Sequence, residues 1–404
     1  MKQVRTIAAG VLVMASIGGS GLAQTTTSQT VALQPAIPVS WADSITIKGD
    51  LRYRYESIKD DSKLDANKET FTRQRDRFRA RISAEAKCND NLKAVVGLTT
   101  DEGTPGGDPI SGNQTLTGGG TKKSIFVDLA YLDYNFFGDN ANELHAIAGK
   151  MKNPFITYND DLVWDPDLTP EGLALKGQAG IGPATLFVNG GYFWIQERSG
   201  AINTDSKMLG AQVAAKVEFM PELALTVGAA YNNYQNIQGF DLVDYVTPAG
   251  SYGNSTMNGT VSGSTTNKAW KSEFTPIVIF GQIDAFVLGT PIAVFAQSVN
   301  NNKADTNNKG LLYGVAIGKA KNPQTWEIGY SHMKLEKDST LGMWTDSDRI
   351  GGGTDGQGHK VYGKYQIAKN LQLAATYFMD DKVISDPAKT KDYKRLQLDL
   401  VATF

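Results

Sequence analysis

From residue 44 onward, apolar and polar residues alternate along many short stretches of the chain. The first stretch sets Ile45, Ile47, Gly49, Leu51, Tyr53 and Tyr55 against Thr46, Lys48, Asp50, Arg52, Arg54 and Glu56. The same alternation returns at residues 223–232, 371–377 and 395–404. Because successive side chains of a strand point to opposite faces, this period of two predicts β-strands with one apolar and one polar face.

The clearest of these stretches spans residues 72–87. It carries an arginine at every second position, at Arg73, Arg75, Arg77, Arg79 and Arg81. The alternate positions are apolar from the middle of the stretch onward and are occupied by Phe78, Ala80, Ile82, Ala84 and Ala86. This pattern predicts a strand with one strongly cationic face and one apolar face.

The connections between the predicted strands alternate in length. Short ones fall near residues 88–91, 179–183, 219–221, 319–323 and 368–370, and long ones near 102–123, 152–171, 235–271, 334–357 and 381–391. About sixteen strands are predicted, with starts near 44, 72, 92, 124, 143, 172, 184, 207, 222, 273, 292, 309, 324, 358, 371 and 392. Residues 125–136 and 184–196 have apolar residues at both parities, so the pattern leaves their inward face open.

Strands of about ten residues, alternately short and long connections, and aromatic residues near the strand ends are typical of an outer-membrane β-barrel. A secreted β-sandwich would also alternate, but here the polar face carries full charges in mid-strand, which require pairing or water. We therefore predict an all-β fold, a transmembrane antiparallel up-and-down barrel of about 16 strands with a water-filled lumen. The basic residues expected to line that lumen are Lys48, Arg52, Arg54, Arg73, Arg75, Arg77, Arg79, Arg81, Lys150 and Arg395.

Aromatic residues near the strand ends are candidates for the belts at the membrane interfaces, where amphipathic rings sit at headgroup depth. These residues are Tyr53, Tyr55, Tyr131, Tyr134, Trp194, Trp326 and Tyr330.

The amino-terminal residues predict export and three segments. Lys2 and Arg5 precede an apolar run at residues 7–17 that is too short to span a membrane as a helix, and small residues follow it. We expect a signal peptide at residues 1–23, a flexible lead-in at 24–43 that is rich in Thr, Ser, Gln and Pro, and the barrel at 44–404. The outer membrane of a Gram-negative cell is the predicted destination, with its lipid as the surrounding partner.

Composition excludes several other classes of protein. The formal charge is −2, and loss of Lys2 and Arg5 with the signal peptide leaves −4, so no nucleic-acid partner is expected. The single cysteine, Cys88, cannot form an internal disulfide. The three histidines are far apart in sequence and no catalytic or metal-binding motif is present, which predicts no enzyme activity, no cofactor and no metal site. The aspartates and glycines of residues 346–355 favour a flexible exposed loop over a calcium site.

Six stretches of the chain resemble the putative porin family of Gram-negative outer membranes, a 16-stranded type related to the phosphate-selective porins. They are GDLRYRYE at 49–56, RQRDRFRAR at 73–81, NDNLKAVVGLTT at 89–100, DPISGNQTL at 108–116, GKMKNPF at 149–155 and WDPDLTPEG at 164–172. The resemblance covers about a third of the chain and implies a homotrimeric pore for passive diffusion of ions and small hydrophilic solutes. The terminal Phe404 resembles the aromatic residue by which such barrels are recognised for assembly.

In porins of this type the loop after the fifth strand folds into the lumen and narrows it, and here that loop lies near residues 152–171. It contains the acidic residues Asp160, Asp161, Asp165, Asp167 and Glu171. An acidic loop opposite the arginine face would set the selectivity of the pore. Two alternatives remain open for the arginines: they pin an inward loop without touching solute, or they line an anion-selective or phosphate-selective pore. The long loops also leave an adhesin or receptor barrel open.

Overall fold

A computed structural model describes residues 44–102, 106–139, 141–158, 160–198, 204–242, 250–258 and 268–404. The chain divides into the units Met1–Ser40 and Trp41–Phe404, and the second unit is the barrel described below. The predicted signal peptide and lead-in, residues 1–23 and 24–43, lie outside the described residues.

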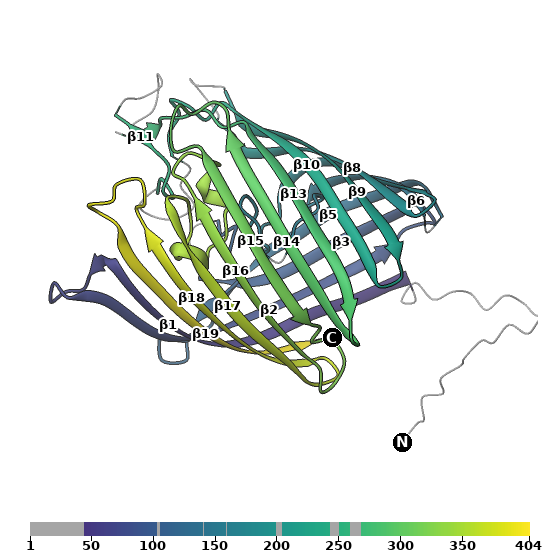
Figure 1. The fold of residues 1–404 in the computed structure, drawn as a ribbon, viewed down its shortest axis with the longest axis horizontal. Helices are drawn as coiled ribbons and strands as arrows, with labels where there is room; N and C mark the ends of the chain where they lie inside the picture. Colours follow the sequence, from purple (N-terminus) through teal and green to yellow (C-terminus); the bar gives the residue numbers. More distant parts are fainter. Residues whose placement is uncertain are drawn as a thin grey trace, which may run out of the picture. The chain divides into compact units, whose positions relative to one another are not determined.

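The described residues form sixteen long antiparallel strands joined into one closed sheet (Figure 1). These are β1 (Ile45–Leu64), β2 (Thr70–Lys87), β3 (Leu92–Asp101), β5 (Ser124–Asp139), β6 (Asn142–Lys150), β7 (Glu171–Ile181), β8 (Ala184–Gln196), β9 (Ser206–Met220), β10 (Leu223–Gln235), β13 (Pro276–Val287), β14 (Thr290–Asn301), β15 (Lys309–Gly318), β16 (Trp326–Leu335), β17 (Gly356–Ala368), β18 (Leu371–Lys382) and β19 (Lys391–Thr403). Every predicted strand start lies within three residues of an observed one. The predicted fold class is confirmed.

Closure of the sheet comes from β1, which pairs with β2 on one side and with β19 on the other. Beyond β19, the amide of Phe404 donates to the carbonyl of Gly49 at 3.0 Å, and the Gly49 amide donates to the Phe404 carbonyl at 2.9 Å. A Cβ atom at Gly49 would lie 2.4 Å from the Phe404 ring and 2.5 Å from the backbone carbonyl oxygen of Arg81, and the second contact cannot be relieved by a side-chain rotation, so this position favours glycine. A closed sheet leaves no unpaired backbone edge, which is what a lipid environment demands.

Three strands of two residues accompany the barrel. β4 (Gln114–Thr115) continues the sheet beside β2, while β11 (Thr256–Met257) and β12 (Ala269–Trp270) form a small separate hairpin. Two 3-10 turns, η2 (Gly342–Trp344) and η3 (Arg349–Gly351), lie in the connection between β16 and β17. Within the described residues, no helix is long and apolar enough to cross a membrane.

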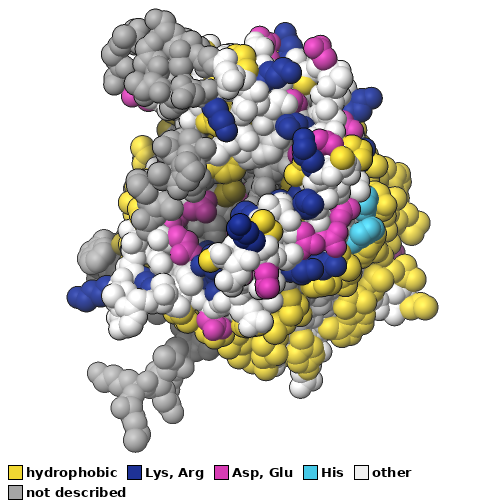
Figure 2. Space-filling model, turned by 90° about the vertical axis from the view of Figure 1, so that its left-hand side faces the viewer, with side chains coloured by type: hydrophobic (Ala, Val, Ile, Leu, Met, Phe, Trp, Pro, Cys, Tyr) yellow, Lys and Arg dark blue, Asp and Glu magenta, His cyan; other side chains and the backbone are white. Residues whose placement is uncertain are grey.

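The outer surface of the sheet is apolar. About half of the side-chain surface is exposed at one outward position after another, including Ile47, Leu51, Val96, Leu173, Val213, Ile279, Ile328 and Val361. Figure 2 shows hydrophobic side chains gathered over the lower right of the molecule, below a surface rich in charged side chains. Such exposure of large apolar residues is unfavourable in water and is what a lipid-facing barrel requires.

The structure explains why residues 125–136 and 184–196 carry apolar residues at both alternating positions. A β-bulge opposite Gly97 and Leu98 shifts the register of β5, so Ile125 and Val127 face outward before the bulge, and Leu132 and Tyr134 after it. This shift turns Tyr131 inward, where it packs against the interior cluster, so its predicted place in an aromatic belt is wrong. In β8 both faces are apolar because Phe193 is fully buried inside the barrel.

Parts of three long connections lie in the interior: residues 107–115, the described residues of 151–170, and residues 336–355. Their buried apolar residues join those of β8 to β16 in one cluster, with Leu162, Trp164, Leu341, Trp344 and Ile350 among its members. The prediction that residues 346–355 form a flexible exposed loop is therefore wrong. Arg349 and Ile350 are nearly inaccessible to solvent, and their connection packs against the inner side of the barrel.

Candidate channel constriction

One side of the lumen carries a charged wall, which we define as Arg52, Arg54, Arg75, Arg77, Arg79, Arg81 and Arg395. These side chains come from β1, β2 and β19, whose register places Arg54 opposite both Arg77 and Asp399. They share one face because each lies at the inward parity of its strand, as the alternation predicts. Six of the seven arginines form ion pairs, so the wall is a network of mixed charge.

Towards the long-loop end of β1 and β2, the arginines of the wall surround Glu56, which has no exposed surface. Its carboxylate accepts hydrogen bonds from Arg75 Nε at 2.6 Å and from Arg395 Nε at 2.9 Å. Arg54 binds Asp399 through two parallel hydrogen bonds, from Nε at 2.7 Å and from Nη2 at 2.8 Å. Bidentate guanidinium–carboxylate pairs of this kind are strong and orient both partners.

Towards the short-turn end of β2, the arginines of the wall bind residues of two connections. Arg77 donates to Glu102 at 2.7 Å and to the carbonyl of Asn113 at 3.0 Å. Arg79 and Arg81 both contact Asp167 of the connection 151–170, at 3.1 and 3.0 Å. The connection after the fifth long strand is therefore attached to the arginine face through one carboxylate.

The other acidic residues of that connection reach different strands. Asp160 forms an ion pair with Lys360 of β17 and accepts a hydrogen bond from Ser331 of β16. Asp161 accepts from Gln297 Nε2 of β14 at 2.8 Å and caps its own turn through the amides of Val163 and Trp164. Residues 151–170 thus run through the interior from the charged wall to β14, β16 and β17.

The connections 151–170 and 336–355 pack against each other and share hydrogen bonds. The Trp164 and Trp344 rings stack with centroids 5.6 Å apart, and Tyr234 packs against Trp344 at 5.7 Å. The amide of Asp165 donates to the carbonyl of Trp344 at 2.7 Å, while Asp165 Oδ2 accepts from the Ser347 amide at 2.8 Å. Asp348 completes the junction by pairing with Arg395 at 2.8 Å and Arg54 at 3.3 Å.

Burial divides the carboxylates of these connections into two groups. Desolvation raises the pKa of Asp161 and of Asp346 to about 6, and burial together with Asp167 and Asp346 raises the pKa of Asp165 well above its usual range. The guanidiniums of Arg81 and Arg79 outweigh desolvation and lower the pKa of Asp167. Those of Arg395 and Arg54 likewise lower the pKa of Asp348. The wall therefore faces ionised carboxylates, whereas the loop junction contains readily protonated ones.

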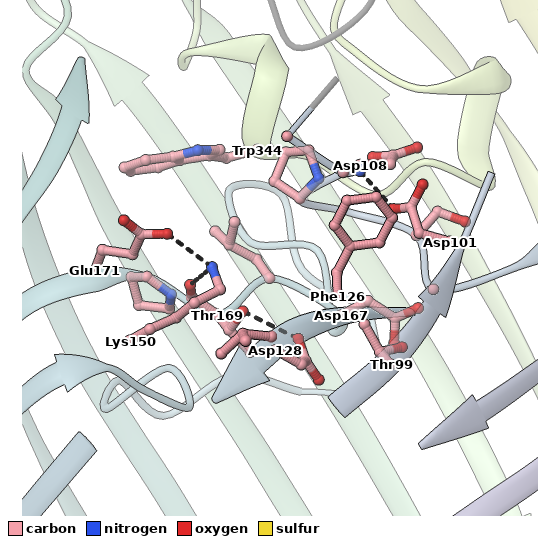
Figure 3. Close-up of a pocket in the computed structure, with 18 of the residues that line it drawn as sticks. Thr99, Asp101, Asp108, Phe126, Asp128, Lys150, Asp167, Thr169, Glu171 and Trp344 are labelled. Atoms are coloured by element: carbon pink, nitrogen blue, oxygen red, sulfur yellow. Dashed lines mark hydrogen bonds and ion pairs between the residues drawn. The ribbon is translucent and has the colours of Figure 1, made fainter. Parts of the chain in front are cut away.

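Two cavities adjoin the connection 151–170, and the residues that line both are Arg81, Asp128, Asp167, Leu168 and Thr169. One, of about 440 Å³, also touches Asp101 and Gln196 at the long-loop ends of their strands. The other, of about 460 Å³, also touches Lys48 and Thr403, at the opposite end of β1 and β19. Figure 3 shows the first cavity, with Asp167, Asp128 and Thr169 along its floor and Trp344 above.

The remaining predicted residues lie at the edges of this arrangement. Lys150 bridges the Thr169 carbonyl and Glu171, each at 3.0 Å (Figure 3). Lys48 pairs with Glu85 near the short-turn end, and Arg73 is exposed towards the long-loop end. Arg52 donates to Asn113 Oδ1 at 2.5 Å and has no ion-pair partner among the described residues. The Nε atom of Arg52 is buried without a hydrogen-bond partner.

Sequence reasoning missed most of the carboxylates that pair with the charged wall: Asp50, Glu56, Glu102, Asp128, Asp348 and Asp399. A signal existed for Asp50 and Glu56, because both share the parity of Arg52 and Arg54 in the first alternating stretch. Within the described residues no group of three or more His, Cys, Asp or Glu side chains could hold a metal ion.

Comparison with known families decides the identity of this barrel. The sequence matches the family described as Putative porin over residues 61–261 and 273–404. The chain belongs to the putative porin family. This membership and the barrel fold indicate an outer-membrane channel. No protein of the curated set matches the sequence.

Solved structures of similar fold are outer-membrane porins. The chain is similar to OprB of Pseudomonas putida in its high-pH structure, with 12% identity, a TM-score of 0.54, and coverage of 90% of this chain and 95% of that one. It is also similar to OmpF of Salmonella typhi in complex with daunomycin, with 10% identity, a TM-score of 0.50, and coverage of 90% and 99%. At such low identity these matches support the porin fold alone.

Proposed function

We propose that this porin is a general diffusion channel of weak charge selectivity, which passes ions and small hydrophilic solutes along the charged wall. The observation that carries the proposal is the charge balance there. The seven arginines of the wall contact or lie beside seven carboxylates of the described chain, which are Asp50, Glu56, Glu102, Asp128, Asp167, Asp348 and Asp399. Fields of opposite sign at such close spacing largely cancel beyond about one Debye length, roughly 8–10 Å.

The route proposed for solutes runs between the two cavities, past Arg81, Asp167 and Thr169. Support comes from the opposite interior of the barrel, which is closed by packed apolar residues including Phe193, Phe295 and Trp344. Residues 151–170 form the constriction in this proposal, because they separate the cavities while touching both sides of the lumen. Export by the signal peptide and assembly as a homotrimer belong to the proposal as well.

An anion-selective or phosphate-selective pore is the second candidate, and Arg52 is the residue that favours it. Its guanidinium lies beside Arg79 in the register of β1 and β2 and lacks an ion-pair partner among the described residues. An unpaired arginine can bind phosphate bidentately. A single such site inside a balanced network gives a local anion contact without making the whole pore anion-selective.

The deciding experiment is planar-bilayer recording with the purified barrel in a KCl gradient, followed by phosphate on one side. Weak selectivity without phosphate block is expected. A strong anion preference with phosphate competition that disappears in Arg52→Gln would favour the second candidate instead. A folded barrel without conductance would contradict both and favour an adhesin or receptor.

Charge reversal tests whether the wall lines the route. Arg77→Glu combined with Arg79→Glu removes two positive charges, adds two negative ones, takes from Asp50 its ion pair with Arg79 and leaves Glu102 only its longer contact with Arg75 at 3.6 Å. The reversal potential should move towards cation selectivity while heat-modifiable migration shows a folded barrel. Unchanged selectivity in a folded variant would mean that these arginines only pin the inward connection.

A further inference from the structure

Two of the three histidines meet on the outer surface of the barrel. His332 of β16 and His359 of β17 are direct partners in the strand register, and their ring centroids are 4.7 Å apart. Both lie at the parity of Ile328 and Val361, which are about half exposed on the lipid-facing side. Each lies three residues from the long-loop end of its strand, Leu335 for β16 and Gly356 for β17.

The surroundings place this pair at the edge of the apolar belt. Tyr313 and Tyr330 flank the histidines, with ring centroids 5.3 Å from His332 and 5.9 Å from His359. One position further towards the loops, Lys334 pairs with Glu336 at 3.3 Å, so the surface becomes charged. Figure 2 shows histidine side chains at this margin, between the hydrophobic surface and acidic and basic residues. In an outer-membrane barrel the long loops face outward, so the pair lies at the external headgroup level.

The hydrogen bonds of the two rings leave nitrogen atoms available. The Tyr330 hydroxyl lies 2.8 Å from His359 Nδ1, which holds that ring in place and leaves Nε2 without a partner among the described contacts. His332 Nδ1 is buried and has no hydrogen-bond partner. A buried ring nitrogen without a partner is unfavourable in a finished structure, and a ligand that accepts its lone pair would remove that cost.

We propose that His332 and His359 form a surface site for one transition-metal ion of the Cu²⁺ or Zn²⁺ class. Imidazole nitrogens bind such ions at about 2.0–2.1 Å, which places two nitrogens of one site roughly 3 Å apart. Rings directly opposite one another across an antiparallel pair, at 4.7 Å between centroids, can reach that separation by side-chain rotation. Water completes the coordination, because the described chain supplies no third His, Cys, Asp or Glu ligand here. Tyr330 acts as the group that orients a ligand.

This inference is independent of which solutes cross the pore. The site faces away from the lumen, and its occupancy is not required for conduction. A metal ion there would lie beside the phosphate-bearing headgroups of the membrane and could share its open positions with phosphate oxygens. Occupancy should fall as the solution is acidified, because protonated rings cannot bind a metal.

The test titrates the detergent-solubilised full-length barrel with Cu²⁺, in a Cys88→Ser background because Cys88 is an exposed thiol. Calorimetry and electron paramagnetic resonance should show one ion bound through nitrogen. His332→Gln and His359→Gln should each abolish that binding, and Tyr330→Phe should weaken it about tenfold. The matched control is His145→Gln, whose ring binds Asp133 at 2.7 Å inside the barrel and which should leave binding unchanged.

Heat-modifiable migration reports folding of every variant, and all four should migrate as folded barrels because the changed side chains lie on the outer surface or at a solvated inner position. The proposal is overturned if the Cys88→Ser barrel binds no Cu²⁺, if either single histidine variant binds as the background does, or if His145→Gln removes the ion. Zn²⁺ should compete with the bound Cu²⁺, and failure to compete would exclude Zn²⁺ from the class of ligand.

Discussion

The two sides of the barrel interior accommodate their inward-facing side chains in different ways. Along β1, β2 and β19, inward charges are neutralised by neighbouring charges, and Glu56 is buried among arginines. Along β8 to β16, inward apolar residues pack against the connection 151–170: the Phe193 ring lies 6.2 Å from that of Phe155, and the Phe295 ring lies 6.1 Å from that of Tyr158. The first solution leaves polar groups that water and solutes can approach, whereas the second closes space. Under the proposed function, the charged half of the lumen would conduct and the packed half would support it.

The largest effect is expected on the packed side, from Trp344→Ala. Loss of a buried tryptophan costs about 3–5 kcal/mol, and here it also removes the stacking that joins the two inward connections. Larger and noisier single-channel conductance is expected in bilayer recordings, with earlier loss of the folded band on heating. Trp326→Ala is the control, because Trp326 lies at the outward parity of Ile328 and is 47% exposed. Equal behaviour of the two variants would contradict the supporting role of this half.

A smaller effect is expected on the charged side, from Glu56→Gln. This change keeps the shape of the side chain but removes the charge shared by Arg75 and Arg395. Because Gln keeps one acceptor oxygen, the main loss is a buried guanidinium donor without a partner, which costs about 1–3 kcal/mol. We expect a lower unfolding temperature together with a shift of the reversal potential towards anions. Glu85→Gln, in the exposed pair with Lys48, should cost under about 1 kcal/mol. A stability loss without any shift in selectivity would remove the wall from the conducting route.

The smallest expected effect is a pH dependence of the open-channel noise. It distinguishes the carboxylates of the inward connections whose pKa is raised from those that pair with arginines. The pKa values of Asp161 and Asp346 are raised to about 6, so folding favours their protonated forms. Their contribution to stability is present below their ordinary pKa of 3.8 and is lost as pH rises through about 6. The pKa of Asp167 is lowered, so its contribution is lost only as pH falls below that ordinary value. Open-channel noise should therefore increase between about pH 4 and pH 7.

Recording at a series of pH values checks this directly, and Asp346→Asn is the matched variant because it keeps a neutral side chain at every pH. That variant should lose part of the pH dependence while retaining its conductance at low pH. Noise that instead increases towards pH 3, with none between pH 4 and 7, would assign the dependence to the arginine-paired carboxylates.

Local pattern was sufficient to predict the strands and the shared face of the arginines, because a period of two depends only on neighbouring residues. It was not sufficient for the interior. Glu56 and Arg395 are 339 positions apart, and a pair of that separation depends on closure of the sheet. Residues 336–355 can fold inward only if the inner face of the barrel that they meet is apolar. Phe193, in the segment 184–196 whose inward face the pattern left open, indicated that this face is apolar. Leu341, Trp344 and Ile350 were the corresponding signal within the loop.

The seam between β1 and β19 has a consequence for how the barrel assembles. Its ion pair between Arg54 and Asp399 joins residues 345 positions apart, so it forms only after every other strand is in place. Until then both edge strands carry unpaired backbone groups, and such edges invite pairing with other chains. Contacts of such long sequence separation are also slow to form. Closure is therefore expected late in assembly, and until it occurs the open edges can pair with other chains. The ion pair at the seam stabilises the barrel only after closure is complete.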